Sequence, residues 1–233
     1  RGAPSVNSNW GNTVAILAGD FLMARASEVA ASTLGQEAVR LLARTYAELV
    51  EGQTLELQVD HNLKHGPVEY YRIIGGKTAS LIRTSARLGA MASDATPEVI
   101  EAVSIWAWEL GMVFQITDDA LDLVATDGFL GKPAGSDIGE GKFTLPVLFA
   151  LQGPEGARIS ELLSAPPPYP DESVSEVIEL VRSGGFVDQA LEEAAARVGS
   201  ARQAIATLPD GEAKEVLSRL GTYLLSRVTA ARD

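Results

Sequence analysis

The sequence has no cysteine, only two histidines, and no uninterrupted apolar run of about 18 residues, the length that spans a membrane. Without cysteine, the chain forms neither a disulfide nor a thiolate metal site. No signal-peptide pattern opens the sequence, so neither secretion nor a membrane span is indicated. These absences fit a reducing cytoplasm, and we expect a cytoplasmic location.

Basic residues are also scarce, because 19 lysines and arginines stand against 31 aspartates and glutamates, which gives a net charge of −12. A nucleic-acid partner is therefore not expected, since such binding needs a basic surface that replaces the counterions of the phosphates. An acidic protein still binds a small phosphorylated ligand where metal ions and a few lysines reverse the potential locally. The charge argues against a polyanion, but not against a diphosphate.

No stretch shows a sustained two-residue alternation of apolar and polar residues, so no strand is expected. Hydrophobic residues make up 46% of the chain and charged residues 21%, which is typical of a globular protein. Apolar residues recur at helical spacing, and the pattern predicts these helices: 11–34, 36–58, 67–92, 97 to the aspartates near 118, 143–152, 155–164, 171–183 and 186–231, the last broken near 208–211. We therefore expect one all-α domain over residues 1–233, a single-domain bundle of long helices.

Two adjacent glycines, Gly75 and Gly76, interrupt the third of these helices directly before Lys77 and Thr78. A glycine pair inside a helix predicts a kink. A kink frees backbone groups and turns the next side chains inward, so Lys77 and Thr78 are candidates for an interior site. The alternative is a solvated lysine beside a flexible joint.

Three carboxylates, Asp118, Asp119 and Asp122, stand near the end of the long apolar helix that begins at residue 97. Asp118 and Asp122 are four residues apart, so they project from the same helical face, where like charges repel. Mg²⁺ would offset this repulsion, since it takes oxygen ligands and usually binds one or two carboxylates plus substrate phosphates. The alternative is a solvated acidic turn, but the glycine-rich loop that follows carries Lys132 and Lys142 and favours the metal interpretation.

Several motifs occur in an order that resembles a known family. They are RGAPSVN at 1–7, GDFLMARA at 19–26, IIGGKTASLI at 73–82, and FQITDDALD at 114–122 followed by GKPAGSD and GKFTLP. Together they resemble the trans-isoprenyl (polyprenyl) diphosphate synthases, whose second aspartate-rich region matches the last motif. The resemblance is close over residues 1 to about 150; beyond that it extends only to a set of helices.

The resemblance implies an isoprenoid synthase-like bundle that condenses an allylic diphosphate with isopentenyl diphosphate and releases diphosphate. It also implies a Mg²⁺ cofactor, ionisation to an allylic cation, and a homodimer. The physical logic agrees with the residues, because Mg²⁺ stabilises the charge that builds on the leaving diphosphate. An apolar interior would keep water from quenching the cation.

The resemblance further assigns roles to individual residues. It implies metal binding by Asp118, Asp119 and Asp122, catalysis and substrate binding by Lys77, Thr78, Gln115, Lys132 and Lys142, and contact with isopentenyl diphosphate by Arg1.

The chain departs from the family's pattern at its start. Arg1 matches the second arginine of the family's Arg-Arg-Gly segment, so the first aspartate-rich motif and the helices before it are missing. The simplest interpretation is an N-terminally truncated domain that holds half of a catalytic site. We expect no prenyl transfer from these 233 residues alone.

Two other functions fit parts of the same pattern. A non-catalytic partner subunit of an active synthase would share the fold, but such subunits tend to lose their aspartate motifs, and the second motif is complete here. A class I terpene cyclase would share the metal site, but cyclases usually lack the GKPAGSD–GK pattern and the Arg-Gly segment.

Two further pairs carry smaller expectations. His61 and His65 are four residues apart in a polar loop with no third ligand nearby, so we expect solvated loop histidines rather than a metal pair. Glu51 and Gln53 are expected near the same region of a bundle, where they would line the cavity.

Overall fold

The computed structural model describes residues 3–124 and 134–232, and all regular structure in these ranges is helical. The elements are α1 Val6–Leu34, α2 Gln36–Val59, α3 Pro67–Ile74, the π-helical turn η1 Gly75–Ala79, α4 Ser80–Ala92, α5 Pro97–Val124, α7 Ser136–Gly139, α8 Leu145–Gln152, α9 Gly156–Leu162, α10 Asp171–Ser183, α11 Phe186–Ala204 and α12 Glu212–Ala230. The all-α prediction is confirmed, and the predicted helices are found close to their expected bounds.

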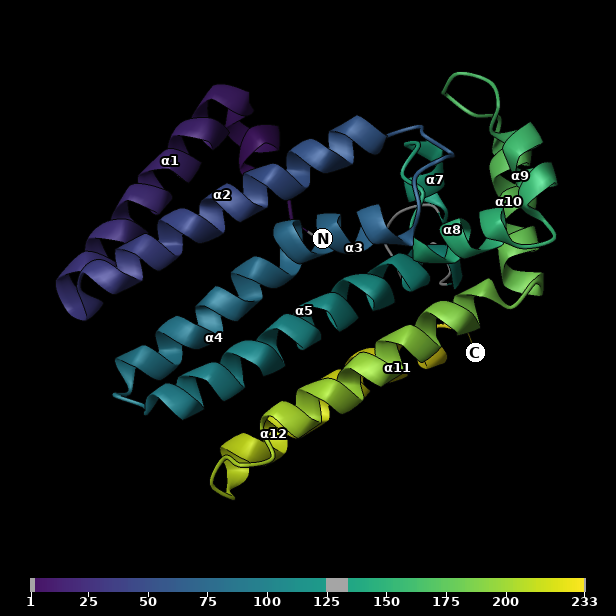
Figure 1. Ribbon diagram of the computed structural model, residues 1–233. Helices are drawn as coiled ribbons and strands as arrows, with labels where there is room; N and C mark the ends of the chain where they lie inside the picture. Colours follow the sequence, from purple (N-terminus) through teal and green to yellow (C-terminus); the bar gives the residue numbers. More distant parts are fainter. Residues whose placement is uncertain (1–2, 125–133, 233) are drawn as a thin grey trace.

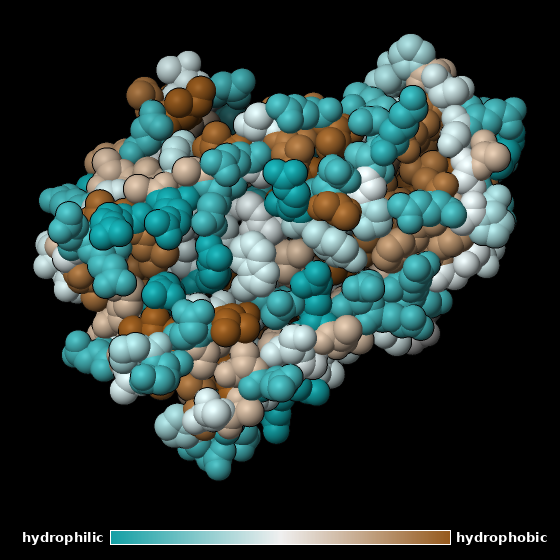
Figure 2. Space-filling model, viewed as in Figure 1, coloured by the Kyte–Doolittle hydropathy of each residue, from teal (hydrophilic) through white to brown (hydrophobic). Residues whose placement is uncertain are grey.

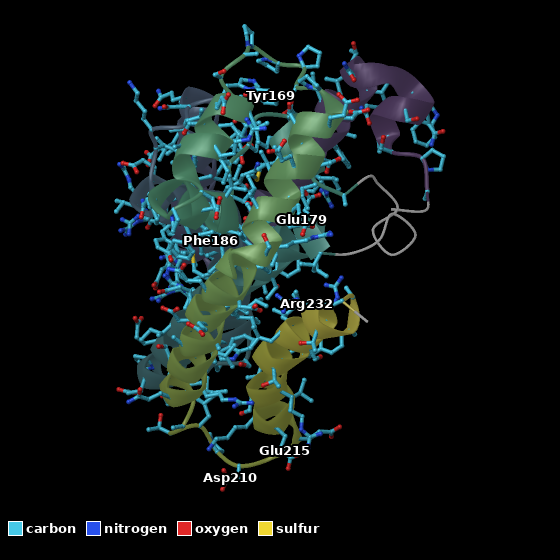
Figure 3. The ribbon with its side chains drawn as sticks, turned by 90° about the vertical axis from the view of Figure 1, so that its right-hand side faces the viewer. Tyr169, Glu179, Phe186, Asp210, Glu215 and Arg232 are labelled. Carbon is cyan, nitrogen blue, oxygen red and sulfur yellow. The ribbon has the colours of Figure 1, made fainter. Side chains whose placement is uncertain are left out.

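The long helices lie side by side in one layer, in the order α2, α4, α5 and α11, with α1 along the outer edge of α2 (Figure 1). The shorter helices α7 to α10 gather at the end of α5 that carries the aspartates. Helices α11 and α12 form a hairpin, with Asp210 in its turn, Phe186 at the start of α11 and Arg232 just beyond the end of α12 (Figure 3). The aspartates therefore lie where the long layer meets the short helices.

Helix α5 is the centre of the bundle, because it packs against α4, α11 and α12. Its residues Val113, Ile116 and Leu121 are buried, and burying each such side chain contributes about 1.5–3 kcal/mol. Gly111 allows α5 to approach η1 closely, since a Cβ built on Gly111 would stand 2.6 Å from the Cα of Ala79. The apolar sequence of α5 thus reflects neighbours on several sides.

Helix α5 is also the one helix of the described ranges that is long and apolar enough to cross a membrane. Core helices of other folds pass the same test. Its packing between α4 and α11 and its aspartates favour the core interpretation here.

The glycine pair that predicted a kink forms a π-helical turn, η1, between α3 and α4. A Cβ on Gly76 would stand 2.7 Å from the carbonyl oxygen of Glu48, and a Cβ on Gly52 would stand 2.7 Å from the amide nitrogen of Lys77. The turn and α2 are therefore in backbone contact, which only glycine permits at both positions. Such π turns are frequent at functional sites, and this one carries Lys77 and Thr78.

Helix α1 differs from the others in how little of it is buried. It begins at Val6, earlier than predicted, and breaks its helical geometry at Gly11, where φ is 81°. Five of its large apolar side chains are between 62% and 66% exposed, namely Trp10, Ile16, Leu17, Phe21 and Leu22. Brown, apolar atoms accordingly gather at the upper left of the surface, over α1 (Figure 2).

Candidate active site

A cavity of about 170 Å³ lies between α2, α3, η1, α5 and the segment that follows α7. Its lining includes most of the residues that the sequence singled out, namely Lys77, Thr78, Gln115, Asp118, Asp119 and Lys142. Asp122 is not in the lining. Arg1 and Lys132 lie outside the described residues, so their predicted roles stay predictions.

Asp118 faces the cavity from α5 and is half-buried. Over the ranges 3–124 and 134–232, no hydrogen-bond donor or cation holds its carboxylate. A carboxylate in this position keeps its lone pairs for a ligand that enters the cavity.

Asp119, the next residue, is 5% exposed, and each of its carboxylate oxygens accepts one hydrogen bond from a neutral donor. The hydroxyl of Tyr70 donates to its Oδ2 at 2.6 Å, and Nε2 of Gln115 donates to its Oδ1 at 2.8 Å. Burial raises the pKa of Asp119 to about 7; the two hydrogen bonds lower it, and the nearby charges of Asp137 and Asp118 raise it further. Asp119 therefore lines the cavity as an oriented carboxylate.

Asp122 is 2% exposed and holds the segment that carries Lys142. Its Oδ1 accepts from the hydroxyl of Ser136 at 2.9 Å, its Oδ2 accepts from the amide of Asp137 at 3.1 Å, and its carbonyl accepts from the amide of Gly135 at 2.8 Å. The three aspartates of one motif thus occupy three different environments.

The two described lysines of the motif each contact a glutamate. Nζ of Lys77 lies 2.6 Å from Glu56, and Nζ of Lys142 lies 2.6 Å from Glu140. The hydrogen bond that Lys142 donates to Glu140 raises the pKa of Lys142, so this lysine stays charged. Both ammonium groups reach the cavity and have a carboxylate partner that a phosphate oxygen can replace.

The sequence did not predict that several other residues line the cavity, namely Glu56, Asp60, His65, Tyr70 and Asp137. A signal existed for Tyr70, because it precedes Lys77 by seven residues, which places both on one helical face. Glu56 of α2 gave no signal, since its position depends on the backbone contact between α2 and η1.

The cavity is acidic, because five carboxylates (Glu56, Asp60, Asp118, Asp119 and Asp137) outnumber its two lysines and leave a formal charge of −3 when all are ionised. A diphosphate does not enter such a site without added positive charge. Hard oxygen donors beside lysines suit Mg²⁺, which completes its shell with waters and phosphates. Within the described residues no three ligating side chains form a metal site by themselves.

Two smaller expectations are revised. His65 is not a solvated histidine, because Nδ1 lies 2.6 Å from the carbonyl of Asn62 and Nε2 lies 3.2 Å from the carbonyl of Phe143. His61 is exposed, as expected. Gln53 is not in the lining of the cavity and donates to Glu56 at 2.8 Å. Glu51 lines a separate groove, which Arg72 also lines.

Comparisons with known proteins agree with the site. A family model described as polyprenyl synthetase matches residues 1–181. The nonaprenyl diphosphate synthase of Mycobacterium tuberculosis is 42% identical over 229 residues, which cover 97% of this chain and 68% of that protein.

Solved structures give the same result. A polyprenyl synthase from Caulobacter crescentus, complexed with calcium and isoprenyl diphosphate, matches with a TM-score of 0.87 and 33% identity over 95% of this chain and 68% of that one. A geranylgeranyl pyrophosphate synthase from Corynebacterium glutamicum, also complexed with calcium and isoprenyl diphosphate, matches with a TM-score of 0.83 and 40% identity over 96% of this chain and 70% of that one.

Proposed function

Because this chain belongs to the polyprenyl synthetase family, its reaction class is the extension of a prenyl diphosphate, and we propose that the cavity around Asp118 is where this occurs. In this proposal an allylic diphosphate condenses with isopentenyl diphosphate, and diphosphate is released. The observation that carries it is the meeting of carboxylates, two lysines and an apolar wall in one cavity. We also propose a cytoplasmic location, which the lack of cysteine supports.

A divalent cation belongs to the proposal, because two relatives were solved with calcium and isoprenyl diphosphate. We propose Mg²⁺ for this chain, bound through the aspartate motif. Asp118 is the ligand that points into the cavity, Asp119 is the oriented carboxylate beside it, and Asp122 contributes by fixing the segment that follows. When bound, Mg²⁺ supplies the positive charge that stabilises the departing diphosphate.

The side chains of the cavity then have separate tasks. Lys77 and Lys142 exchange their glutamate partners for phosphate oxygens and place positive charge where negative charge develops. Thr78 and Gln115 present polar groups beside the aspartates. The apolar side chains of Ile73, Ile74 and Phe143 complete the wall, where they keep water from an allylic cation.

The synthase interpretation is supported over the two alternatives. Relatives and solved structures similar to nearly the whole chain are named as prenyl or polyprenyl diphosphate synthases. A partner subunit without catalysis would have no need of a carboxylate that faces the cavity, as Asp118 does. The Lys142 segment, held by Asp122, is the part of the pattern that a cyclase usually lacks.

The test is product analysis with the protein translated from the complete reading frame. Radiolabelled isopentenyl diphosphate should be incorporated when Mg²⁺ and an allylic primer are present. Asp118→Ala should lower turnover by about 10²-fold or more, because a charge-stabilising group is lost. The control is Asp210→Ala, which changes an aspartate that is 99% exposed in the turn between α11 and α12. A near-normal rate in Asp118→Ala would show the metal assignment to be wrong.

We further propose that the protein is a homodimer through the exposed apolar face of α1. The face includes Phe21 and Leu22, and α2 also exposes a large apolar side chain, Leu57, which is 65% exposed. Large exposed apolar side chains that gather on one surface mark an interaction site. Phe21→Glu should convert the dimer to a monomer in light scattering, whereas Tyr223→Glu, at a similarly exposed aromatic on α12, should not. A monomeric parent protein, or a dimer that survives Phe21→Glu, contradicts this proposal.

A further inference from the structure

Tyr70 is a buried tyrosine that the proposed chemistry does not use. It lies on α3, is 4% exposed, and donates its hydroxyl to Oδ2 of Asp119 at 2.6 Å. A buried hydroxyl needs a hydrogen-bond partner, but a backbone carbonyl would satisfy it as well as a carboxylate. Here the partner is the residue next to Asp118, the carboxylate that faces the cavity.

The second oxygen of Asp119 is held from the same side of the cavity. Nε2 of Gln115 donates to Oδ1, and Oε1 of Gln115 accepts from the hydroxyl of Thr78 at 2.9 Å. Tyr70, which donates to Asp119, lies on α3, and Thr78, which donates to Gln115, lies on η1. Gln115 and Asp119 both lie on α5. One hydrogen bond to each oxygen fixes the plane of the carboxylate.

Both donors to Asp119 are neutral groups. They orient the carboxylate without cancelling its negative charge, as a lysine or arginine partner would. A carboxylate has about four lone-pair sites, so two remain after these bonds. Asp119 is thus held in one orientation and still able to attract a cation.

We propose that Tyr70 is a positioning residue of the metal site, which acts by holding the carboxylate of Asp119 in the orientation that a metal-bound diphosphate requires. The proposal rests on the function proposed above. Hydrogen-bond partners of metal-binding groups act in this way in other sites, where their loss lowers metal affinity by about 10- to 100-fold. The π turn η1 contributes to this arrangement, because it places Thr78 within hydrogen-bond distance of Gln115.

The substitution Tyr70→Phe tests the hydroxyl alone. The ring stays in place, where it packs against the ring of Tyr71 with centroids 5.6 Å apart. The matched control is Tyr71→Phe, which removes the same atom from the next residue. Its ring lies under the guanidinium of Arg197, with 5.1 Å from Cζ to the ring centroid, and it lines a separate groove from the aspartates.

The measurement is Mn²⁺ binding in the presence of inorganic pyrophosphate, followed by the electron paramagnetic resonance signal of free Mn²⁺. Tyr70→Phe should weaken Mn²⁺ binding by about 10- to 100-fold, and Tyr71→Phe should stay within about twofold of the parent protein. The Mg²⁺ concentration that half-activates prenyl transfer should rise by a similar factor in Tyr70→Phe. The KM for both diphosphates at saturating Mg²⁺ should stay the same, which a general loss of structure would not produce.

Three outcomes would overturn the proposal. The first is Mn²⁺ affinity within about twofold of the parent in Tyr70→Phe. The second is an equal loss of affinity in Tyr71→Phe, since that would show a general effect of removing a hydroxyl from α3. The third is a parent protein that does not bind Mn²⁺ with pyrophosphate, which would overturn the proposed metal chemistry as well. The first and second outcomes leave the proposed function standing, so the two failures are distinguishable.

Discussion

Gly111→Ala is expected to destabilise the protein, although alanine is the better helix former. A Cβ at this position would lie 2.6 Å from the Cα and 2.9 Å from the Cβ of Ala79. Carbon atoms in contact normally stay about 3.5–4.0 Å apart, so α5 and η1 must separate by roughly 1 Å. Overpacking of this kind costs about 1–3 kcal/mol, and a helical glycine replaced by alanine returns about 0.8–1 kcal/mol. The net loss should be up to about 2 kcal/mol.

Gly89→Ala is the matched control, because Gly89 lies inside α4 and a Cβ there meets nothing within 4 Å. This variant should gain up to about 1 kcal/mol. Urea unfolding followed by circular dichroism measures both changes, and about 1 kcal/mol corresponds to a shift of about 2–4 °C in melting temperature for a domain of this size. We expect the free energy of unfolding to fall in Gly111→Ala and to rise in Gly89→Ala, although both variants replace a helical glycine with alanine.

Gly111→Ala should also affect the site, because the contact it separates sets Thr78 beside Gln115 at 2.9 Å. Mn²⁺ binding with pyrophosphate should weaken in Gly111→Ala and stay unchanged in Gly89→Ala. If Gly111→Ala is as stable as Gly89→Ala, the close packing of α5 on η1 does not exist as described, and the reasoning fails.

Two further predictions concern the aspartates. Burial raises the pKa of Asp119 from 3.8 to about 7, so the folded state binds this proton more tightly, and the stability present below about pH 4 is lost as pH rises to about 7. A shift of about three pKa units limits this loss of stability to about 4 kcal/mol. In metal-free buffer, the free energy of unfolding of Asp119→Asn should therefore increase relative to that of the parent as pH rises from about 4 to about 7. Asp210→Asn should follow the parent, and parallel profiles for all three proteins would contradict the burial argument. Asp122→Ala removes the acceptor for Ser136 and Asp137, so it should raise the KM for the diphosphate substrates. Limited proteolysis should cut Asp122→Ala faster near 134–142, and an unchanged cleavage rate would refute the role of Asp122 in holding this segment.

The helices were largely predictable because their apolar residues recur at helical spacing, and this depends only on the local sequence. The glycine pair at 75–76 predicted an irregularity but not its type, since a π turn arises from contact with α2. The start of α1 was placed too late, because Ser5 caps a first turn that precedes the break at Gly11.

The candidate site was predictable where its residues stand in motifs of the sequence, and not where single residues outside the motifs join it through packing. Lys77, Thr78, Gln115 and Asp118 were proposed from motifs, and the fold brings them into one cavity. Glu56 could not be linked to them, because its position follows from the backbone contact between α2 and η1. Tyr70 could have been linked to Lys77 through its spacing of seven residues.

The sequence alone determined the all-α class, the absence of thiol chemistry, and the identity of the aspartates and lysines that suit a metal-bound diphosphate. These properties depend on residue type and local spacing. Only the tertiary structure decided what each of the three aspartates does. Asp118 faces a cavity, Asp119 is held by Tyr70 and Gln115, and Asp122 holds the next segment. The physical reason is that a carboxylate's role depends on which donors surround it, and those donors come from distant parts of the chain.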